Sequence, residues 1–115
     1  LVDAGLAPAL STDFNPGSCP LQSLPEVLTF AGLRYGYSAA EALTAATLNA
    51  AATLGRAAEL GSLEPGKQAD LVLFDHPNLE HLLYEFGRNA VRAVWKRGRL
   101  ALQRTPFQAE RRPLA

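Results

Sequence analysis

Four residues near the N-terminus, Asp13, Asn15, Gly17 and Ser18, have types and spacing that fit a reactive or ligand-binding site. They follow a mostly apolar run, LAPALSTD, which lacks polar alternation and therefore predicts a strand covered on both faces, ending at Asp13. A carboxylate at the carboxyl end of such a strand lies where α/β barrels carry their reacting groups. The local sequence alone favours a simpler interpretation, in which the aspartate only caps the turn that follows.

The turn itself is the second candidate. Asn15-Pro16-Gly17-Ser18 predicts a type II turn, because proline fixes φ at the second position and glycine supplies a positive φ at the third. Such a turn would leave the backbone N–H groups of Gly17 and Ser18 pointing outward beside a hydroxyl, as a small set of donors for a carboxylate or another anion. A plain turn that binds nothing is the alternative.

Other residues with reactive side chains give weaker signals. His76 and His81 are five positions apart, but no cysteine or carboxylate joins them in a recognisable ligand pattern, so we expect solvated surface histidines. Cys19 has no evident base partner and is not expected to be a nucleophile. Trp95 lies on an apolar arm and is expected to belong to the core.

The elements that must position these residues begin with two helices. Apolar residues at helical spacing predict a helix over 24–35, running into Gly36. A second helix begins at a capping box formed by Ser38 and Glu41, and Gly55 ends it. The apolar face of this second helix is expected to contain Leu43, Ala46, Ala50 and Leu54.

The residue pattern changes at Gly61, from helical spacing to turn and strand signals. A turn at Pro65-Gly66 leads to a predicted strand over 71–74, and apolar spacing then predicts a helix over 79–86. Residues 90–102 predict a β-hairpin around a basic turn that contains Gly98. The polar stretch 103–115 carries two prolines and is expected to be a loosely held or disordered tail.

Composition limits the function classes. The chain of 115 residues fits one small domain. Its 11 basic and 11 acidic residues give no net positive charge that would attract nucleic acid or an anionic membrane. No segment has the roughly 18 uninterrupted apolar residues of a membrane span. No signal peptide is visible, and one cysteine fits a reducing cytoplasm. The opening LVDAG predicts the last turn of a helix closed by Gly5, so we expect a segment of a longer chain.

Four motifs together resemble a known family. STDFNPGS, LNAAATLG, GSLEPGKQADLVLFD and EFGRNAVRAVWKRG, in this order, resemble the C-terminal part of the imidazolonepropionase family within the metal-dependent amidohydrolase superfamily. The resemblance covers roughly residues 1–100. GSLEPGKQADLVLFD is widespread in the superfamily, whereas TDFNPGS and EFGRN favour the imidazolonepropionases over dihydroorotases, deaminases and amidases.

The resemblance implies an α/β fold: the C-terminal part of a (β/α)8 barrel, followed by strands of a small composite β-sandwich domain. Residues 1–60 would supply the last barrel strand and helices, residues 61–102 part of the sandwich, and residues 103–115 a tail. The missing N-terminal barrel portion would be required for function. The resemblance is also compatible with a homodimer of the full-length enzyme.

The resemblance also implies roles for the first candidates. Asp13 would be the carboxylate ligand of a catalytic zinc or iron ion and would accept a proton from metal-bound water. Asn15, Gly17 and Ser18 would contact the small-molecule substrate, 4-imidazolone-5-propanoate, whose ring amide is hydrolysed to N-formimidoyl-L-glutamate in histidine degradation. The family's His-x-His ligand pair and its later metal-binding histidine have no counterpart here, and one carboxylate does not complete a zinc or iron site.

Two alternatives stay open at this point. The chain could belong to another amidohydrolase, such as a cyclic amidase, a deaminase or an N-acyl amino acid hydrolase. It could also be a non-catalytic fragment or scaffold module. The 115 residues alone are not expected to catalyse a reaction, because the strand ending at Asp13 would lack both barrel neighbours.

Overall fold

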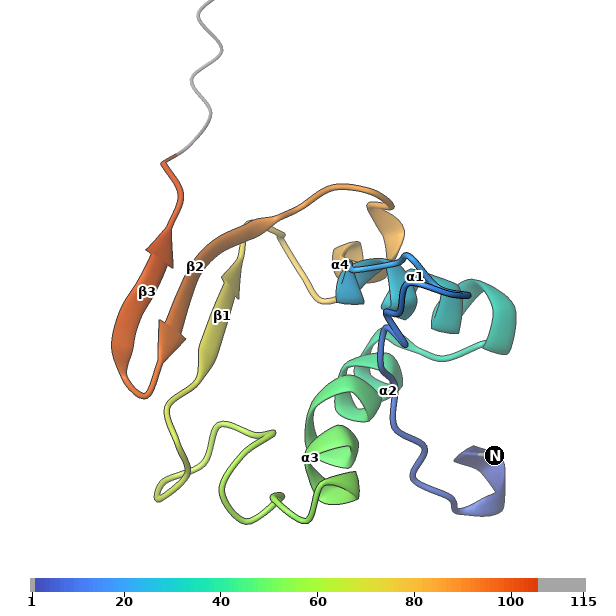
Figure 1. Cartoon of the computed structure of the whole chain (residues 1–115), viewed down its shortest axis with the longest axis horizontal. Helices are drawn as coiled ribbons and strands as arrows, with labels where there is room; N and C mark the ends of the chain where they lie inside the picture. Colours follow the sequence, from blue (N-terminus) through green and yellow to red (C-terminus); the bar gives the residue numbers. More distant parts are fainter. Residues whose placement is uncertain (1, 106–115) are drawn as a thin grey trace, which may run out of the picture.

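The computed structural model describes residues 2–105, which form a group of helices beside a small antiparallel sheet (Figure 1). The helices α1, α2, α3 and α4 cluster on one side, and the strands β1, β2 and β3 form the other side. This combination fits an α/β fragment. Along the described residues, no helix is long and apolar enough to cross a membrane.

The first long helix, α1, spans Leu24–Tyr35 and confirms the predicted boundaries. It begins with a proline in its first turn, where the missing N–H has no helical partner in any case. It ends at Gly36, whose positive φ of 71° allows its N–H to bond back to the last turn. Upstream, the short 3₁₀ turn η1, Val2–Ala4, is closed by Gly5 as predicted.

The second helical stretch begins with the predicted capping box, in which the Ser38 hydroxyl accepts from the Glu41 N–H and the Glu41 carboxylate accepts from the Ser38 N–H. It is not one uniform helix. It consists of α2, Ala39–Thr44, a π-helical segment η2, Ala45–Asn49, and α3, Ala50–Thr53. A wider π turn changes the backbone pairing locally, and segments of this kind often occur near functional sites.

The core lies among the helices. Its buried part contains Leu28 and Ala31 of α1, Ala42 of α2 and Leu82 of α4, His81–Tyr84. The absence of a side chain at Gly32 permits close packing of α1 on α4, since a Cβ there would lie 3.0 Å from Leu83 Cδ2. Partly buried apolar side chains surround this core: Leu10, Tyr37, Leu43, Ala46, Phe74, Leu79 and Leu83.

The sheet has the order β1-β2-β3, with β1 at Leu71–Phe74, β2 at Val91–Lys96 and β3 at Arg99–Gln103. Both pairings are antiparallel, and the predicted strand and hairpin are confirmed. The hairpin turn places Arg97 and Gly98 at positive φ, as a two-residue turn of type I′ requires. All five residues of β3 are exposed in the described part of the chain.

Four expectations need correction. The predicted strand over 6–13 is absent, because no neighbouring strand among residues 2–105 pairs with it. The predicted helix over 79–86 shortens to α4, because Glu85 leaves helical geometry with ψ of 73°. Leu54, expected on the apolar face of its helix, is 75% exposed. Trp95 is only half-buried, because helices do not cover the sheet. Of the predicted tail, residues 106–115 lie outside the described residues.

Candidate functional site

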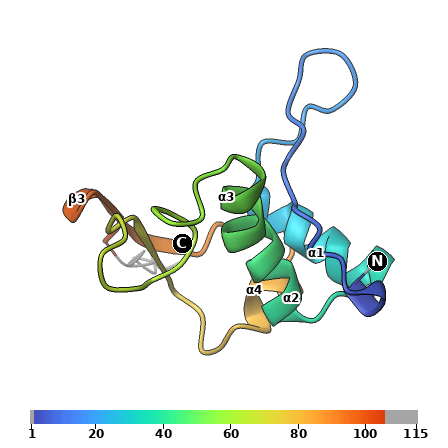
Figure 2. The ribbon, with the colours of Figure 1, turned by 90° about the horizontal axis from the view of Figure 1, so that it is seen from below.

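The candidate site is a loop, residues 11–19, which we call the Asp13 loop. It projects away from the helices and is visible as the blue loop at the top of Figure 2. Two hydrogen bonds fix the segment that leads into it. Leu10 N donates to Ala45 O at 3.0 Å, and Asn49 Nδ2 donates to Pro8 O at 2.9 Å. Both partners lie in the π segment η2, which therefore anchors the base of the loop.

The loop is closed by Asn15. Its side-chain oxygen accepts from Gly17 N at 2.9 Å and from Ser18 N at 2.7 Å, and the Ser18 hydroxyl lies 3.3 Å from the same oxygen. Its side-chain nitrogen donates to Asp13 O at 2.8 Å. Asn15 N also donates to Cys19 O at 2.9 Å, which forms an isolated antiparallel bridge. One asparagine thus connects both sides of the loop.

This geometry corrects the predicted type II turn. That turn needs a positive φ at Gly17, and Gly17 is not among the residues with positive φ. The N–H groups of Gly17 and Ser18 do not point outward as free donors, because the side-chain oxygen of Asn15 accepts from both. The turn is an asparagine turn, in which the side chain replaces a backbone acceptor. The backbone does not provide the predicted anion-binding donor pair.

Asp13 has a positive φ of 51°, a conformation that non-glycine residues adopt infrequently and that aspartate tolerates better than most. Its side chain is exposed, and no hydrogen bond or ion pair within residues 2–105 engages the carboxylate. The carboxylate is therefore available to bind a cation or to accept a proton. It is one such group, and it lies in the same loop as Asn15, Gly17 and Ser18.

The described residues alone do not fit a metal centre. Within residues 2–105, no group of three or more histidine, cysteine, aspartate or glutamate side chains lies close enough to hold an ion. Zinc sites need three or four such ligands. Asp13 could contribute one ligand, and any other would have to come from outside these residues.

His76 corrects the expectation of a solvated surface histidine. Its side chain is only 5% exposed, and its ring stacks on Phe74 with the ring centroids 6.3 Å apart. The Nδ1 atom lies 3.7 Å from Glu85 Oε2, too far for a hydrogen bond, and has no partner among the described residues. The His81 ring centroid lies 6.3 Å from that of His76. His81 is partly buried, and its Nδ1 atom lies 2.5 Å from Asn78 Oδ1.

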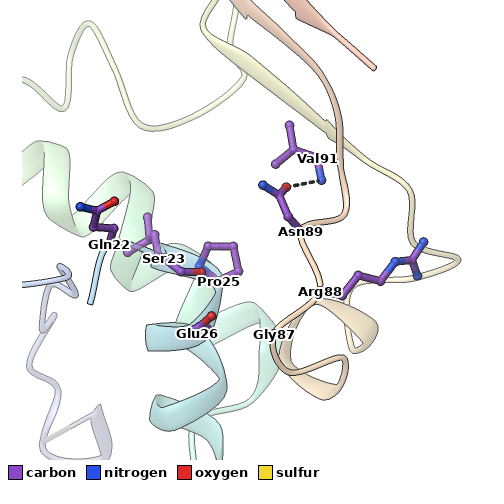
Figure 3. A pocket seen from close by; sticks show the side chains of 9 residues that line it. Gln22, Ser23, Pro25, Glu26, Gly87, Arg88, Asn89 and Val91 are labelled. Carbon is purple, nitrogen blue, oxygen red and sulfur yellow. Dashed lines mark hydrogen bonds between the residues drawn. The ribbon is translucent and has the colours of Figure 1, made fainter. Parts of the chain in front are cut away.

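The motif EFGRN, residues 85–89, connects the helices to the sheet. Arg88 pairs with Glu85, and this hydrogen bond holds the pKa of the Glu85 carboxyl below its usual value. The same guanidinium donates to Asp75 O at 3.3 Å, directly after β1. Asn89 Oδ1 accepts from Val91 N at 3.1 Å, at the start of β2 (Figure 3). The motif thus has a structural role in this part of the chain.

A cavity of about 420 Å³ lies between the start of α1 and this motif (Figure 3). Arg88 turns its guanidinium away from the cavity toward Asp75, so its charge does not face the space. None of the four predicted site residues lines it. The lining consists of Gln22, Ser23, Leu24, Pro25, Glu26, Gly87, Arg88, Asn89 and Val91.

Comparison with known proteins decides the family. Residues 1–101 match the amidohydrolase family over nearly the whole chain. The chain belongs to the amidohydrolase family. An amidohydrolase structure from Thermotoga maritima MSB8 superposes with a TM-score of 0.71 at 31% identity, covering 90% of this chain and 25% of that one. Guanine deaminase from E. coli superposes with a TM-score of 0.64 at 26% identity, covering 84% and 28%.

Among the curated amidohydrolase relatives, an imidazolonepropionase from Geobacillus sp. (strain WCH70) is 50% identical over 103 residues, which is 90% of this chain and 24% of the relative. The imidazolonepropionase of Treponema denticola is 42% identical over 104 residues, or 90% of this chain and 25% of the relative. The chain therefore spans about a quarter of the length of the curated relatives it matches. The resemblance inferred from the motifs is confirmed.

Sequence reasoning missed two features of this amidohydrolase segment. The burial of His76 was missed because it depends on Phe74 and on the return of the chain after α4. The use of Asn15 as the internal acceptor was missed, although asparagine two residues before glycine is a recognised signal for such a turn. That signal competed with the Pro-Gly pair, which favoured a type II turn.

Proposed function

We propose that these 115 residues form part of an imidazolonepropionase, a hydrolase that opens the ring amide of 4-imidazolone-5-propanoate. The observation that carries the proposal is the similarity to proteins of that name, at 42–51% identity over about 90% of the chain. In the reaction, the oxygen of water bonds to the ring acyl carbon and the ring C–N bond breaks. The product is N-formimidoyl-L-glutamate, an intermediate of histidine degradation.

We propose Asp13 as the reacting carboxylate. Its exposed side chain makes no hydrogen bond or ion pair within residues 2–105, which supports a role in binding a cation and accepting a proton. The metal would be one zinc or iron ion, for which Asp13 supplies one oxygen ligand while the others lie outside these residues. Metal dependence is general in the amidohydrolase family.

We propose that the neighbouring turn contacts the small-molecule substrate. The Ser18 side chain is exposed, and its 3.3 Å contact to Asn15 is long for a hydroxyl hydrogen bond, so the hydroxyl is free to turn toward a substrate carboxylate. Gly17 carries no side chain and leaves room beside that hydroxyl. Asn15 belongs to the same rim, and its side-chain oxygen lies 3.3 Å from the Ser18 hydroxyl.

The complete enzyme would require further protein to cover this segment. Large apolar side chains on the described residues are exposed, among them Leu33 at 81% and Tyr84 at 84%. Surface of this kind normally marks a contact with other protein. We propose that residues 1–60 end a barrel, that residues 61–102 join a composite β-sandwich and that residues 103–115 form a tail. We propose a cytoplasmic location, which fits the single cysteine, and a homodimer of the complete enzyme.

A deaminase is the second candidate, because the likeness to E. coli guanine deaminase extends over 84% of the chain. The two functions are separated by assaying the complete polypeptide with each substrate. We expect loss of 4-imidazolone-5-propanoate with formation of N-formimidoyl-L-glutamate, and no release of ammonia from guanine. Turnover of guanine without turnover of the imidazolone would contradict the proposed function.

A further inference from the structure

We infer that Asn49 is a positioning residue, which holds the base of the Asp13 loop against the π segment η2. The inference rests on the proposed function, and it extends the site from the loop to the helical stretch that supports it. Asn49 Nδ2 donates to Pro8 O at 2.9 Å, and the two residues are 41 positions apart. This bond therefore joins two segments that are distant in the sequence.

Helix propensity does not account for an asparagine at this position. Asn49 has ordinary helical backbone angles, with φ of −66° and ψ of −39°. Asparagine is less favourable than alanine inside a helix, because its side chain also bonds to nearby backbone groups in other conformations. Here the side chain is partly buried and bonds outside its own helix, to Pro8 O. The bond to Pro8 gives a physical reason for this polar side chain.

A second hydrogen bond reaches the same short segment. Leu10 N donates to Ala45 O at 3.0 Å, and Ala45 is only 1% exposed. Ala45 and Asn49 begin and end the five residues of η2, so both lie on one face of the helical stretch. That face therefore receives Pro8 and Leu10 together. Of the two bonds, the one from Asn49 is made by a side chain, so a substitution can remove it separately.

The π segment is itself closely packed. A Cβ at Gly61 would lie 2.9 Å from Leu48 Cα and 2.9 Å from Thr47 O, so the chain at Gly61 lies directly against η2. The Leu10 side chain packs against the buried core of the helices. A functional group is held accurately when the elements that carry it are rigid and packed. The segment η2 provides such a support for the base of the loop.

Asp13 is close in sequence to this anchored base. An extended chain advances about 3.3 Å per residue, so a shift of Pro8 or Leu10 reaches Asp13 within about 10 Å of Leu10. The proposed substrate-binding rim lies in the same loop and would shift with it. Loss of the Asn49 bond should therefore reduce both the reaction rate and substrate binding.

The kinetic test replaces Asn49 in the complete polypeptide. Asn49→Ala removes the donor and introduces a strong helix former, whereas Asn49→Asp keeps the size but places an oxygen against Pro8 O. We expect kcat for 4-imidazolone-5-propanoate to fall about 10-fold and KM to rise at least about threefold in both variants, because a displaced loop misplaces both the reacting carboxylate and the contacts to substrate.

The matched control is Thr47→Val, in the same π segment. Thr47 Oγ1 donates to Leu43 O at 2.7 Å, so this substitution removes a side-chain hydrogen bond that stays within the helical stretch. Its kcat and KM should equal those of the wild type. A purely structural role of Asn49 would lower Tm and the apparent kcat through loss of folded enzyme, and would leave KM unchanged. Unchanged KM in the Asn49 variants, or an equal change in Thr47→Val, would overturn the inference.

A second measurement does not depend on turnover. In Asn49→Ala, hydrogen exchange of the Leu10 amide should become about fivefold faster, the effect of losing one ordinary hydrogen bond at the base of the loop. Peptides from α1 should exchange as in the wild type, which shows that the fold is intact. Unchanged exchange at Leu10 would overturn the inference. If the wild type opens no imidazolone, the proposed function fails, and this exchange measurement decides by itself whether Asn49 holds the base of the loop.

Discussion

Gly61, the first residue of the GSLEPGKQAD motif, packs so closely on the second helical stretch that a single methyl group should destabilise the protein. Its φ is 90°, and a Cβ there would lie 2.8 Å from Ala51 Cβ, 2.9 Å from Leu48 Cα and 2.9 Å from Thr47 O. Two of these neighbours are backbone atoms of a helix, which do not move aside easily. Gly61→Ala should therefore lower the free energy of unfolding, because it strains the point at which the chain leaves the helices and leads to the sheet.

Gly66 offers a matched comparison. Its φ is 91°, almost the same as that of Gly61, but a Cβ there would meet nothing within 4 Å. The positive φ should cost about 1–2 kcal/mol in either alanine variant. The reduced freedom of the unfolded chain is also common to both. Only Gly61→Ala adds overpacking, which costs about 1–3 kcal/mol. The difference between the two variants isolates that cost.

The assay is thermal unfolding of the complete polypeptide, followed by circular dichroism at one protein concentration. We expect the Tm of Gly61→Ala to lie at least about 2 °C below that of Gly66→Ala, since 1 kcal/mol shifts Tm by about 2–4 °C in domains of moderate size. Equal Tm values would refute the reasoning, because they would show that the helix does not approach Gly61 as described.

Three further predictions concern single side chains. Hydrogen bonds from Lys96 and from the backbone N–H of Arg97 lower the pKa of Asp70 to about 2. The ionised carboxylate therefore stabilises the fold above about pH 4, and this stabilisation is lost as the pH falls through 2. The Tm difference between the wild type and Asp70→Asn should narrow over that pH range. Ser38→Ala removes the N-cap of α2 and should reduce the free energy of unfolding by about 1 kcal/mol in urea titrations, whereas an unchanged midpoint would contradict the capping role. His76→Phe removes a buried nitrogen without a hydrogen-bond partner in the described chain and should leave Tm unchanged or higher; a clear drop would mean that Nδ1 is engaged.

Local signals in the sequence were sufficient to predict segments whose conformation depends on residues that are neighbours in the chain. The capping box at Ser38, the glycine that ends α1 and the turn before Gly98 each specify their conformation through neighbouring residues. The strand at 71–74 was predicted with its observed bounds because a short apolar run between Asp70 and Asp75 allows little else.

The errors occur where the conformation depends on distant partners. The apolar run 6–13 has the pattern of a buried strand, but a strand also needs a hydrogen-bonded neighbour, and none lies beside it among residues 2–105. The burial of His76 results from packing against Phe74, which periodicity does not reveal. In the site, the bonds inside the turn were not predicted, because Asn15 and the Pro-Gly pair favour different turns. The roles assigned to the residues of the Asp13 loop stay predictions.

The most direct test of the central claim is the effect of Asp13→Asn on hydrolysis of 4-imidazolone-5-propanoate by the complete polypeptide. The substitution keeps size and turn geometry but removes the negative charge, so kcat should fall by at least about 10³-fold, as expected for the loss of a group that transfers a proton and binds a cation. Asp3→Asn, at an exposed position in η1, should leave kcat unchanged. Full activity of Asp13→Asn would contradict the account.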